Sequence, residues 1–122
     1  MSKPKLLMVD DEGRWFSDFI SELETKFDLL YAYRVKSAER VFKEHFSEIA
    51  VITMDGCLSS TFDTEPLVEM MREFGFKGPI IAHSSMSHFN GLLVRAGCSH
   101  QVKKADCRNE DRPVIDLIMS LV

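Results

Sequence analysis

Ala50-Val-Ile-Thr-Met-Asp55-Gly56-Cys57 is a run of apolar, partly β-branched residues that ends in an acid and a glycine. Such a run predicts a strand buried on both faces of a parallel sheet, with the carboxylate of Asp55 at its carboxyl end. Ligands of open parallel α/β sheets bind outside that edge. Asp-Gly is also a common way to leave a strand, so the role of Asp55 depends on the rest of the chain.

Length and composition are those of one globular domain. The chain has 122 residues, of which 45% are hydrophobic and 28% charged, and this size allows one core but not two. We therefore expect a single domain over residues 1–122, with no output domain. The net charge of −4 and the lack of a Lys/Arg run argue against a direct nucleic-acid surface.

The cysteines and the first residues of the chain bear on the cellular compartment that we expect for the protein. Cys57, Cys98 and Cys107 are odd in number and have no CxxC spacing, which favours reduced thiols over disulfides or a zinc site. The chain reaches Asp10 after a run of only four apolar residues, too short for a signal peptide or a membrane span. We expect a cytoplasmic protein without a membrane segment.

Apolar runs alternate with amphipathic segments along the chain. The runs predict strands at residues 5–9, 28–35, 50–55, 79–84 and 100–103. Apolar residues spaced by three or four predict helices at residues 13–26, 37–46, 64–74, 87–96 and 110–121. This alternation with right-handed crossovers requires a parallel sheet with helices on both faces. The expected fold is α/β, a flavodoxin-like doubly wound (βα)5 unit with strand order 2-1-3-4-5.

Polar side chains collect where the predicted strands end. In chain order they are Asp10, Asp11, Asp55, Ser84, Ser85, Lys103 and Lys104. Neighbouring carboxylates repel one another and resist ionisation, and a hard divalent cation such as Mg²⁺ removes that conflict. A lysine and a small hydroxyl beside them suit a phosphoryl group, whose phosphorus a carboxylate can attack.

Four blocks of the sequence resemble the response-regulator receiver domain of two-component signalling. They are Val9-Asp10-Asp11-Glu12, Met54-Asp55-Gly56, Pro79-Ile-Ile-Ala-His-Ser84-Ser85 and Ala96-Gly97-Cys-Ser-His-Gln-Val-Lys-Lys104. The separations also suit the family, with 44 residues from Asp11 to Asp55, 29 from there to Ser84 and 20 more to Lys104. The resemblance covers essentially the whole chain and implies the fold of a chemotaxis regulator.

The resemblance implies a role for each acid. Asp55 would accept a phosphoryl group from a histidine kinase or a histidine phosphotransfer protein. Asp11 and Asp55 would bind Mg²⁺ directly, Asp10 would act largely through water, and the Cys57 backbone carbonyl would complete the protein ligands. A domain of this kind is a signalling unit and not a turnover enzyme.

The resemblance also implies roles for Lys104 and Ser84. Lys104 would pair with Asp55 before the reaction and with a phosphoryl oxygen afterwards, while Ser84 would move toward the phosphoryl group. The surface of the fourth helix, fifth strand and last helix would then signal to an effector that the sequence does not name, or form a homodimer. Lys103 leaves the choice of lysine open by one residue, although the spacing from Ala96-Gly97 favours Lys104.

Three positions depart from the family pattern. Ala105 stands where the family has a proline joined by a cis bond, so we expect a trans loop of different shape. Gln101 replaces the usual aromatic of the signalling switch, and Cys57-Leu-Ser-Ser60 replaces a Met-Pro pair. These departures keep a second function open, a receiver-like interaction module that works without phosphorylation. A haloacid-dehalogenase-type phosphatase is disfavoured, because Cys57 occupies the place of its second acid.

Several of these residues also have simpler structural roles. Asp10 and Asp11 taken alone could cap the helix that follows them. We expect His83 to be a packing histidine that faces away from Ser84, and Trp15 to pack at the rim of the site.

Overall fold

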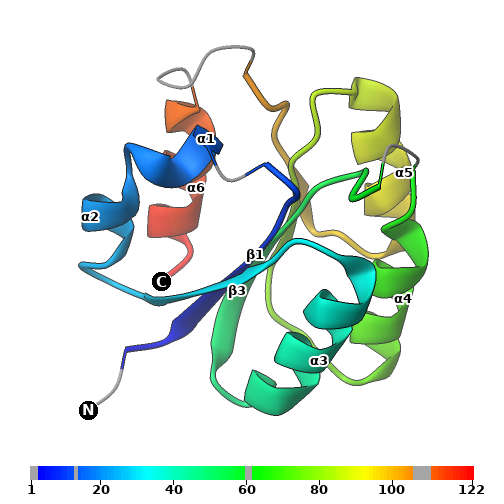
Figure 1. The fold of residues 1–122 in the computed structure, drawn as a ribbon, viewed down its shortest axis with the longest axis horizontal. Coiled ribbons are helices and arrows are strands. Elements are labelled where there is room, and N and C mark those ends of the chain that lie inside the picture. The colour runs from blue at the N-terminus through cyan, green and yellow to red at the C-terminus, as the bar shows by residue number, and fades with distance from the viewer. Residues whose placement is uncertain (1–2, 13, 60–61, 106–110) are drawn as a thin grey trace.

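The computed structural model describes residues 3–12, 14–59, 62–105 and 111–122. It contains a five-stranded parallel sheet in the order β2-β1-β3-β4-β5, as the sequence predicts. The strands are β1 (Lys5–Val9), β2 (Asp28–Ala32), β3 (Ile49–Met54), β4 (Ile80–Ala82) and β5 (His100–Gln101). The sheet runs between two layers of helices, with the carboxyl ends of its strands toward the top of Figure 1.

Helices cover both faces of the sheet (Figure 1). They are α1 (Arg14–Ser17), α2 (Ile20–Leu23), α3 (Val35–His45), α4 (Glu65–Glu73), α5 (Ser87–Ala96) and α6 (Arg112–Ser120). One layer holds α1, α2 and α6, and the other holds α3, α4 and α5. Side chains of β1 alternate between the two cores, with Leu6 and Met8 in the first and Leu7 and Val9 in the second. Burial on both faces explains why the strands are almost continuously apolar.

The helix predicted over residues 13–26 is divided in two. Between α1 and α2, the Phe19 N–H donates to the Phe16 carbonyl at 2.8 Å. This three-residue spacing is tighter than that of an α-helix and interrupts it. Phe16 and Leu23 are both buried in the same core, so the apolar periodicity that predicted the helix is kept across the break.

Predicted element boundaries shift by a few residues elsewhere. β2 ends at Ala32 because α3 already begins at Val35. Ser37 is not the cap of that helix. The Arg34 N–H donates to Ser37 Oγ at 3.2 Å, and the hydroxyl donates to the Arg34 carbonyl at 3.0 Å, so Ser37 acts from the third helical position. The predicted start of the last helix, at residue 110, lies outside the described residues.

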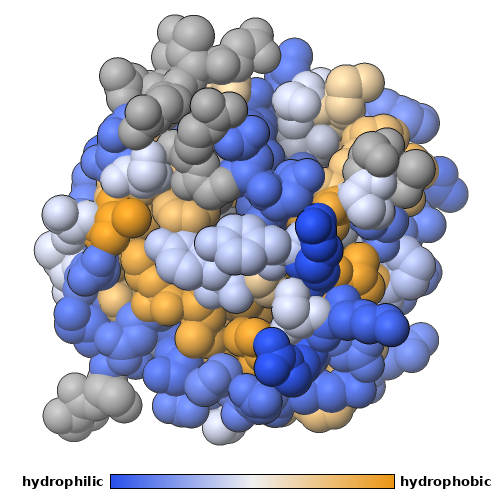
Figure 2. All heavy atoms as spheres, viewed as in Figure 1, coloured by the Kyte–Doolittle hydropathy of each residue, from blue (hydrophilic) through white to orange (hydrophobic). Residues whose placement is uncertain are grey.

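Strand β2 forms one edge of the sheet, since it pairs with β1 alone among the described strands. Its residues Leu29, Leu30 and Tyr31 are only half-buried, as expected for an edge strand. Figure 2 shows hydrophobic side chains gathered across the middle of this face, where β2 crosses the front of the view. Within the residues that the structure describes, no helix has the length and apolar character needed to cross a membrane.

Candidate functional site

Strand pairing places three carboxylates at one edge of the sheet. Val9 of β1 pairs with Met54 of β3, so Asp10 and Asp55 follow side by side. The Asp55 N–H donates to the Val9 carbonyl at 2.9 Å, which continues the pairing by one residue. Oxygen atoms of Asp10, Asp11 and Asp55 lie within 4.8 Å of one another. The three acids expected to meet from the sequence are therefore in one cluster.

The three carboxylates differ in exposure. Asp10 is 4% exposed and Asp55 is 7% exposed, whereas Asp11 is exposed to solvent. Burial raises the pKa of Asp55 to about 7, and the neighbouring charge of Asp10 contributes to the rise. Burial also raises the pKa of Asp10, although the Lys104 ammonium opposes the change. The cluster resists full ionisation, and a bound cation would relieve this.

The donor set fits Mg²⁺. Carboxylate oxygens are hard ligands, and Mg²⁺ in proteins commonly uses one or two of them together with water. Exposed Asp11 leaves one side of the cluster open to solvent. Cys57, whose backbone carbonyl is the further expected ligand, is half-buried two residues after Asp55. Burial and the charge of Asp55 raise the pKa of the Cys57 thiol, so the free thiol stays neutral at physiological pH.

Lys104, which follows strand β5, contacts two of the acids. Its Nζ lies 2.8 Å from Asp10 Oδ2 and 3.4 Å from Asp55 Oδ2. Burial alone would lower the pKa of Lys104, but the carboxylates of Asp10 and Asp55 outweigh it and raise the pKa, so the side chain is an ammonium. Lys103 is exposed, so of the two lysines Lys104 is the one that contacts the acids. Lys104 therefore contacts Asp55 as expected, but it also contacts Asp10, which is the closer of the two acids.

Ser84 is held by a side chain from helix α5. The Ser84 N–H donates to Asn90 Oδ1 at 2.9 Å, and Asn90 Nδ2 donates to the Ser84 carbonyl at 3.1 Å. Both residues are buried, at 3% and 2% exposure. Sequence reasoning missed Asn90, although a polar residue three positions before Leu93 on the buried side of a helix is a signal for such a bond.

The Ser84 hydroxyl lies close to Gly56, the residue that follows Asp55. A Cβ atom built on Gly56 would lie 3.3 Å from Ser84 Oγ and 3.0 Å from Phe89 Cβ. A side chain at position 56 would therefore require Ser84, which follows β4, and Phe89 of α5 to shift by a few tenths of an ångström. The Ser84 hydroxyl also accepts a hydrogen bond from the Met86 N–H at 3.2 Å.

Thr64 fixes the backbone of Asp55 from the loop before α4. Its side chain is fully buried, and its hydroxyl donates to the Asp55 carbonyl at 2.6 Å, with the Gly56 carbonyl at 3.1 Å. The sequence marked Thr64 only as the start of a helix. Helix α4 does begin at the next residue, but the Thr64 side chain bonds to the end of β3 and not to the helix. The local sequence could not indicate this, because the partner lies nine residues earlier.

His83 lies behind the site and is 1% exposed. Its Nε2 is 3.3 Å from Oδ1 of Asp111, the residue before α6, which is 2% exposed. Burial lowers the pKa of His83 although Asp111 opposes the change, so the ring is neutral at physiological pH. The expected packing histidine therefore also has a polar partner, and Asp111 is a residue that sequence reasoning did not single out.

Other expected residues are placed as follows. Gln101 lies in β5 opposite Ala82, with its side chain exposed. The Lys104–Ala105 peptide bond is trans, in agreement with the expectation, and the described residues contain no cis bond. The Trp15 side chain and Cys107 lie outside what the structure describes.

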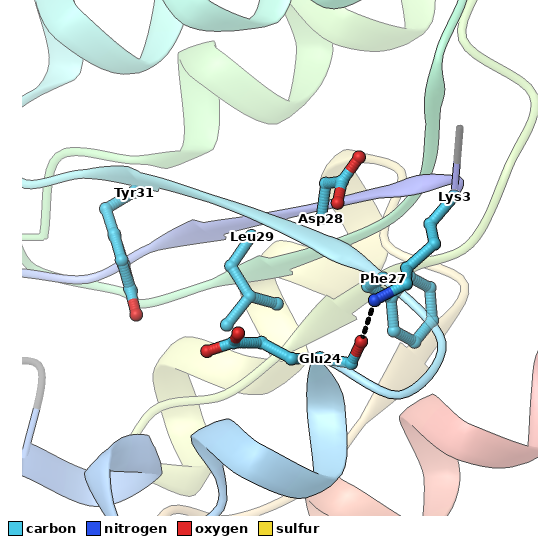
Figure 3. A pocket seen from close by; sticks show the side chains of 6 residues that line it. All are labelled: Lys3, Glu24, Phe27, Asp28, Leu29 and Tyr31. Atoms are coloured by element: carbon cyan, nitrogen blue, oxygen red, sulfur yellow. Dashed lines mark hydrogen bonds between the residues drawn. The ribbon is translucent and has the colours of Figure 1, made fainter. Parts of the chain in front are cut away.

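A separate cavity of about 390 Å³ opens beside the β2 edge (Figure 3). It is lined by Lys3, Glu24, Phe27, Asp28, Leu29 and Tyr31. Asp28 pairs with Lys5 at the start of β1, so this cavity belongs to the amino end of the strands. The carboxylate cluster lies at the opposite end and shares none of these lining residues.

The chain was compared with known sequences and with solved structures, and only solved structures match it. Neither a protein-family model nor a curated protein matches this sequence. The receiver domain of the Francisella response regulator 1452 is 20% identical, with a TM-score of 0.74 over 98% of this chain and 96% of that one. A chain of the CheX–CheY–BeF3–Mg²⁺ complex from Borrelia burgdorferi is also 20% identical, with a TM-score of 0.72 over 98% and 90%.

The receiver domain of Klebsiella pneumoniae RstA, in its BeF3-activated form, is 18% identical, with a TM-score of 0.72 over 96% of this chain and 97% of that one. Each of these structures is matched over 90% or more of its length. The chain therefore has the fold of the response-regulator receiver domains.

Proposed function

We propose that this chain is a phosphoacceptor receiver domain of a two-component response regulator, spanning residues 1–122 and working in the cytoplasm. Asp55 accepts the phosphoryl group from a histidine kinase or a histidine phosphotransfer protein. The observation that carries the proposal is the contact of the Lys104 ammonium with two buried carboxylates, Asp10 and Asp55, at the ligand-binding edge of the sheet. The receiver-domain fold supports it.

The proposed reaction forms one bond and breaks one. An oxygen of the Asp55 carboxylate attacks phosphorus, the phosphorus–nitrogen bond of the donor phosphohistidine breaks, and its electron pair stays on the imidazole nitrogen. Asp55 must be ionised to attack, and its pKa of about 7 leaves both forms populated near neutrality. The Lys104 ammonium offsets charge on the phosphoryl oxygens, and the Ser84 hydroxyl can donate a hydrogen bond to one of them.

Asp10, Asp11 and Asp55 would hold Mg²⁺, with the Cys57 backbone carbonyl as a further ligand. When bound, Mg²⁺ neutralises charge on the acids and on the transferred group. Lys104 lies closer to Asp10 than to Asp55, so Asp11 and Asp55 are the direct ligands of this proposal and Asp10 acts through water. The domain holds one phosphoryl group until water removes it, so it is a signal carrier and not a turnover enzyme.

The signal leaves through the surface of α5, β5 and α6. Ser84 connects the site to that surface, because its backbone is bonded to Asn90 of α5 at two points. Movement of Ser84 toward the phosphoryl group would therefore pull on α5. Met86 and Val94 of this region are exposed apolar residues, and they are available to a downstream effector or to a second copy of the domain.

A second function has one observation in its favour. Gln101 stands at the position of the usual switch aromatic, and its side chain is exposed on β5. With no aromatic ring there to rotate inward, the surface could serve as an interaction module that is independent of phosphorylation. The two functions differ in whether the site responds to a phosphoryl group at all.

Beryllofluoride with Mg²⁺, which mimics a bound phosphoryl group, separates the two functions. We expect amide NMR shifts at Ser84, Lys104 and along α5 in the wild-type protein and none in Asp55→Asn. A wild-type spectrum unchanged by beryllofluoride would reject the phosphoacceptor role and favour the interaction module.

A further inference from the structure

A buried polar contact lies behind the site and joins three segments of the chain. Its members are His83 after β4, Ala105 after Lys104, and Asp111 before α6. His83 is 1% exposed and Asp111 is 2% exposed. Burying a carboxylate this deeply is costly unless hydrogen bonds compensate, so the bonds that Asp111 makes indicate what it is there to hold.

Two groups make hydrogen bonds to the same oxygen of Asp111. The Ala105 N–H donates to Asp111 Oδ1 at 2.9 Å, and His83 Nε2 lies 3.3 Å from the same atom. A carboxylate only accepts hydrogen bonds, so the neutral His83 ring carries its hydrogen on Nε2 in this contact. His83 therefore fixes the side chain of Asp111, and Asp111 fixes the backbone at Ala105.

The backbone of Lys104 needs such support because it lies beyond the sheet. Strand β5 ends at Gln101. Two amides in succession then anchor the chain, with the Lys104 N–H donating to the Ser84 carbonyl at 3.0 Å and the Ala105 N–H donating to Asp111. The lysine backbone is held between the end of β4 and the start of α6 while its ammonium reaches Asp10.

We propose that Asp111, supported by His83, is a positioning residue that holds the Lys104 ammonium against Asp10 and Asp55 through the Ala105 N–H. Its effect on phosphoryl transfer rests on the proposed function, whereas its effect on the backbone does not. The proposal also accounts for alanine at position 105. Proline has no N–H, so a proline there would leave Asp111 Oδ1 without its closest donor.

The first arm of the test uses the unmodified protein. A hydrogen bond transmits a small scalar coupling, so NMR of the ¹⁵N,¹³C-labelled wild type should show a coupling between the Ala105 nitrogen and the Asp111 carboxyl carbon. We expect that coupling to be present without phosphate or Mg²⁺. An assigned spectrum in which Ala105 shows no coupling to Asp111 and its amide exchanges at the rate of an open loop would overturn the proposal.

The second arm compares Asp111→Ala with Asp111→Asn, which keeps an acceptor oxygen. With acetyl phosphate as the donor, we expect the Ala variant to be phosphorylated more slowly by on the order of tenfold, since misplacement of a charged group costs rate. The Asn variant should stay within about threefold of the wild type, because it keeps an acceptor for the Ala105 N–H. Equal rates in Ala and wild type, or equal losses in Ala and Asn, would contradict the proposal.

A second pair of variants, at His83, keeps the proposal testable if Asp111→Ala does not fold. His83→Gln keeps an N–H donor for Asp111, and His83→Leu removes it, so only the Leu variant should slow phosphorylation and weaken the Ala105–Asp111 coupling. Identical behaviour of the two variants would overturn the role of His83. If the wild type takes no phosphoryl group but shows the coupling, the proposed function fails and the positioning of the lysine backbone stands.

Discussion

Lys104 Nζ lies 2.8 Å from Asp10 Oδ2, closer than it lies to the expected phosphoacceptor. The ammonium is thus already engaged by an acid that does not react, and Asp55 is left with a pKa raised to about 7, chiefly by burial. This arrangement makes the state of Asp55 depend on pH in the physiological range. It also means that proton loss from Asp55 and cation binding are linked.

Mg²⁺ binding should therefore tighten as the pH rises. A cation competes with the proton on Asp55, so the apparent Kd should fall by about tenfold per pH unit below about pH 7 and level off above it. Calorimetric titration across this range measures the change. Asp55→Asn has no proton to lose and should show a flatter profile. A wild-type Kd that does not depend on pH between about pH 5.5 and pH 7 would contradict the raised pKa of Asp55.

Asp55→Asn should stabilise the domain at alkaline pH. The folded pKa of Asp55, about 7, lies above its ordinary value of 3.8, so the contribution of protonated Asp55 to stability is fully present below about pH 4 and is lost as the pH rises through about 7. Removing the carboxylate should raise the free energy of unfolding by about 1–3 kcal/mol at about pH 8, and by little at about pH 4. Urea unfolding without Mg²⁺ measures it.

Asp11→Asn is the matched control for that change. It removes the same charge from the same cluster, but the Asp11 side chain is exposed. We expect a smaller gain at about pH 8 than for Asp55→Asn, because an exposed carboxylate has lost less hydration. Equal gains in the two variants would show that overall repulsion, and not the burial of Asp55, sets the stability.

Thr64→Val should weaken the support of Asp55. Valine has nearly the same shape but leaves the buried Asp55 carbonyl without the hydroxyl that donates to it at 2.6 Å. The expected loss is about 1–3 kcal/mol of unfolding free energy. Thr64→Ser keeps the hydroxyl and should lose less. If Ser and Val variants are equally stable in thermal and chemical unfolding, the hydrogen bond has no energetic role.

Two glycine substitutions should have opposite effects. Gly56→Ala places a Cβ 3.0 Å from Phe89 Cβ and 3.3 Å from Ser84 Oγ, so it should destabilise the domain by about 1–3 kcal/mol. Gly91→Ala in α5 meets no atom within 4 Å and should stabilise the helix by up to about 1 kcal/mol. Melting temperatures of the two variants measure these effects. A neutral Gly56→Ala would show that the loop can move away from Ser84 and Phe89.

The sheet and its polar edge could be predicted from the sequence because each depends on a local pattern. Apolar runs such as residues 5–9 and 50–54 are strands by composition, and the strict alternation with helices determines a parallel order. Asp10, Asp11, Asp55 and Lys104 then meet because parallel strands end at one edge. The structure places all four there.

The residues that support the site could not be predicted in the same way. Thr64, Asn90 and Asp111 act through hydrogen bonds to backbone groups of other elements. Such contacts depend on how loops pack in three dimensions, and a threonine or aspartate before a helix reads equally well as a cap. The break between α1 and α2 was missed for a related reason, since apolar spacing is the same for one helix and for two that share a face.

Intact-protein mass after incubation with acetyl phosphate and Mg²⁺ tests the central claim most directly. In this reaction an Asp55 oxygen bonds to phosphorus and acetate leaves, so the mass should rise by one phosphoryl group. We expect that single adduct in the wild type and none in Asp55→Asn. A wild type that stays unmodified while folded and able to bind Mg²⁺, or an adduct that persists in Asp55→Asn, would contradict the account of Asp55 as the phosphoacceptor.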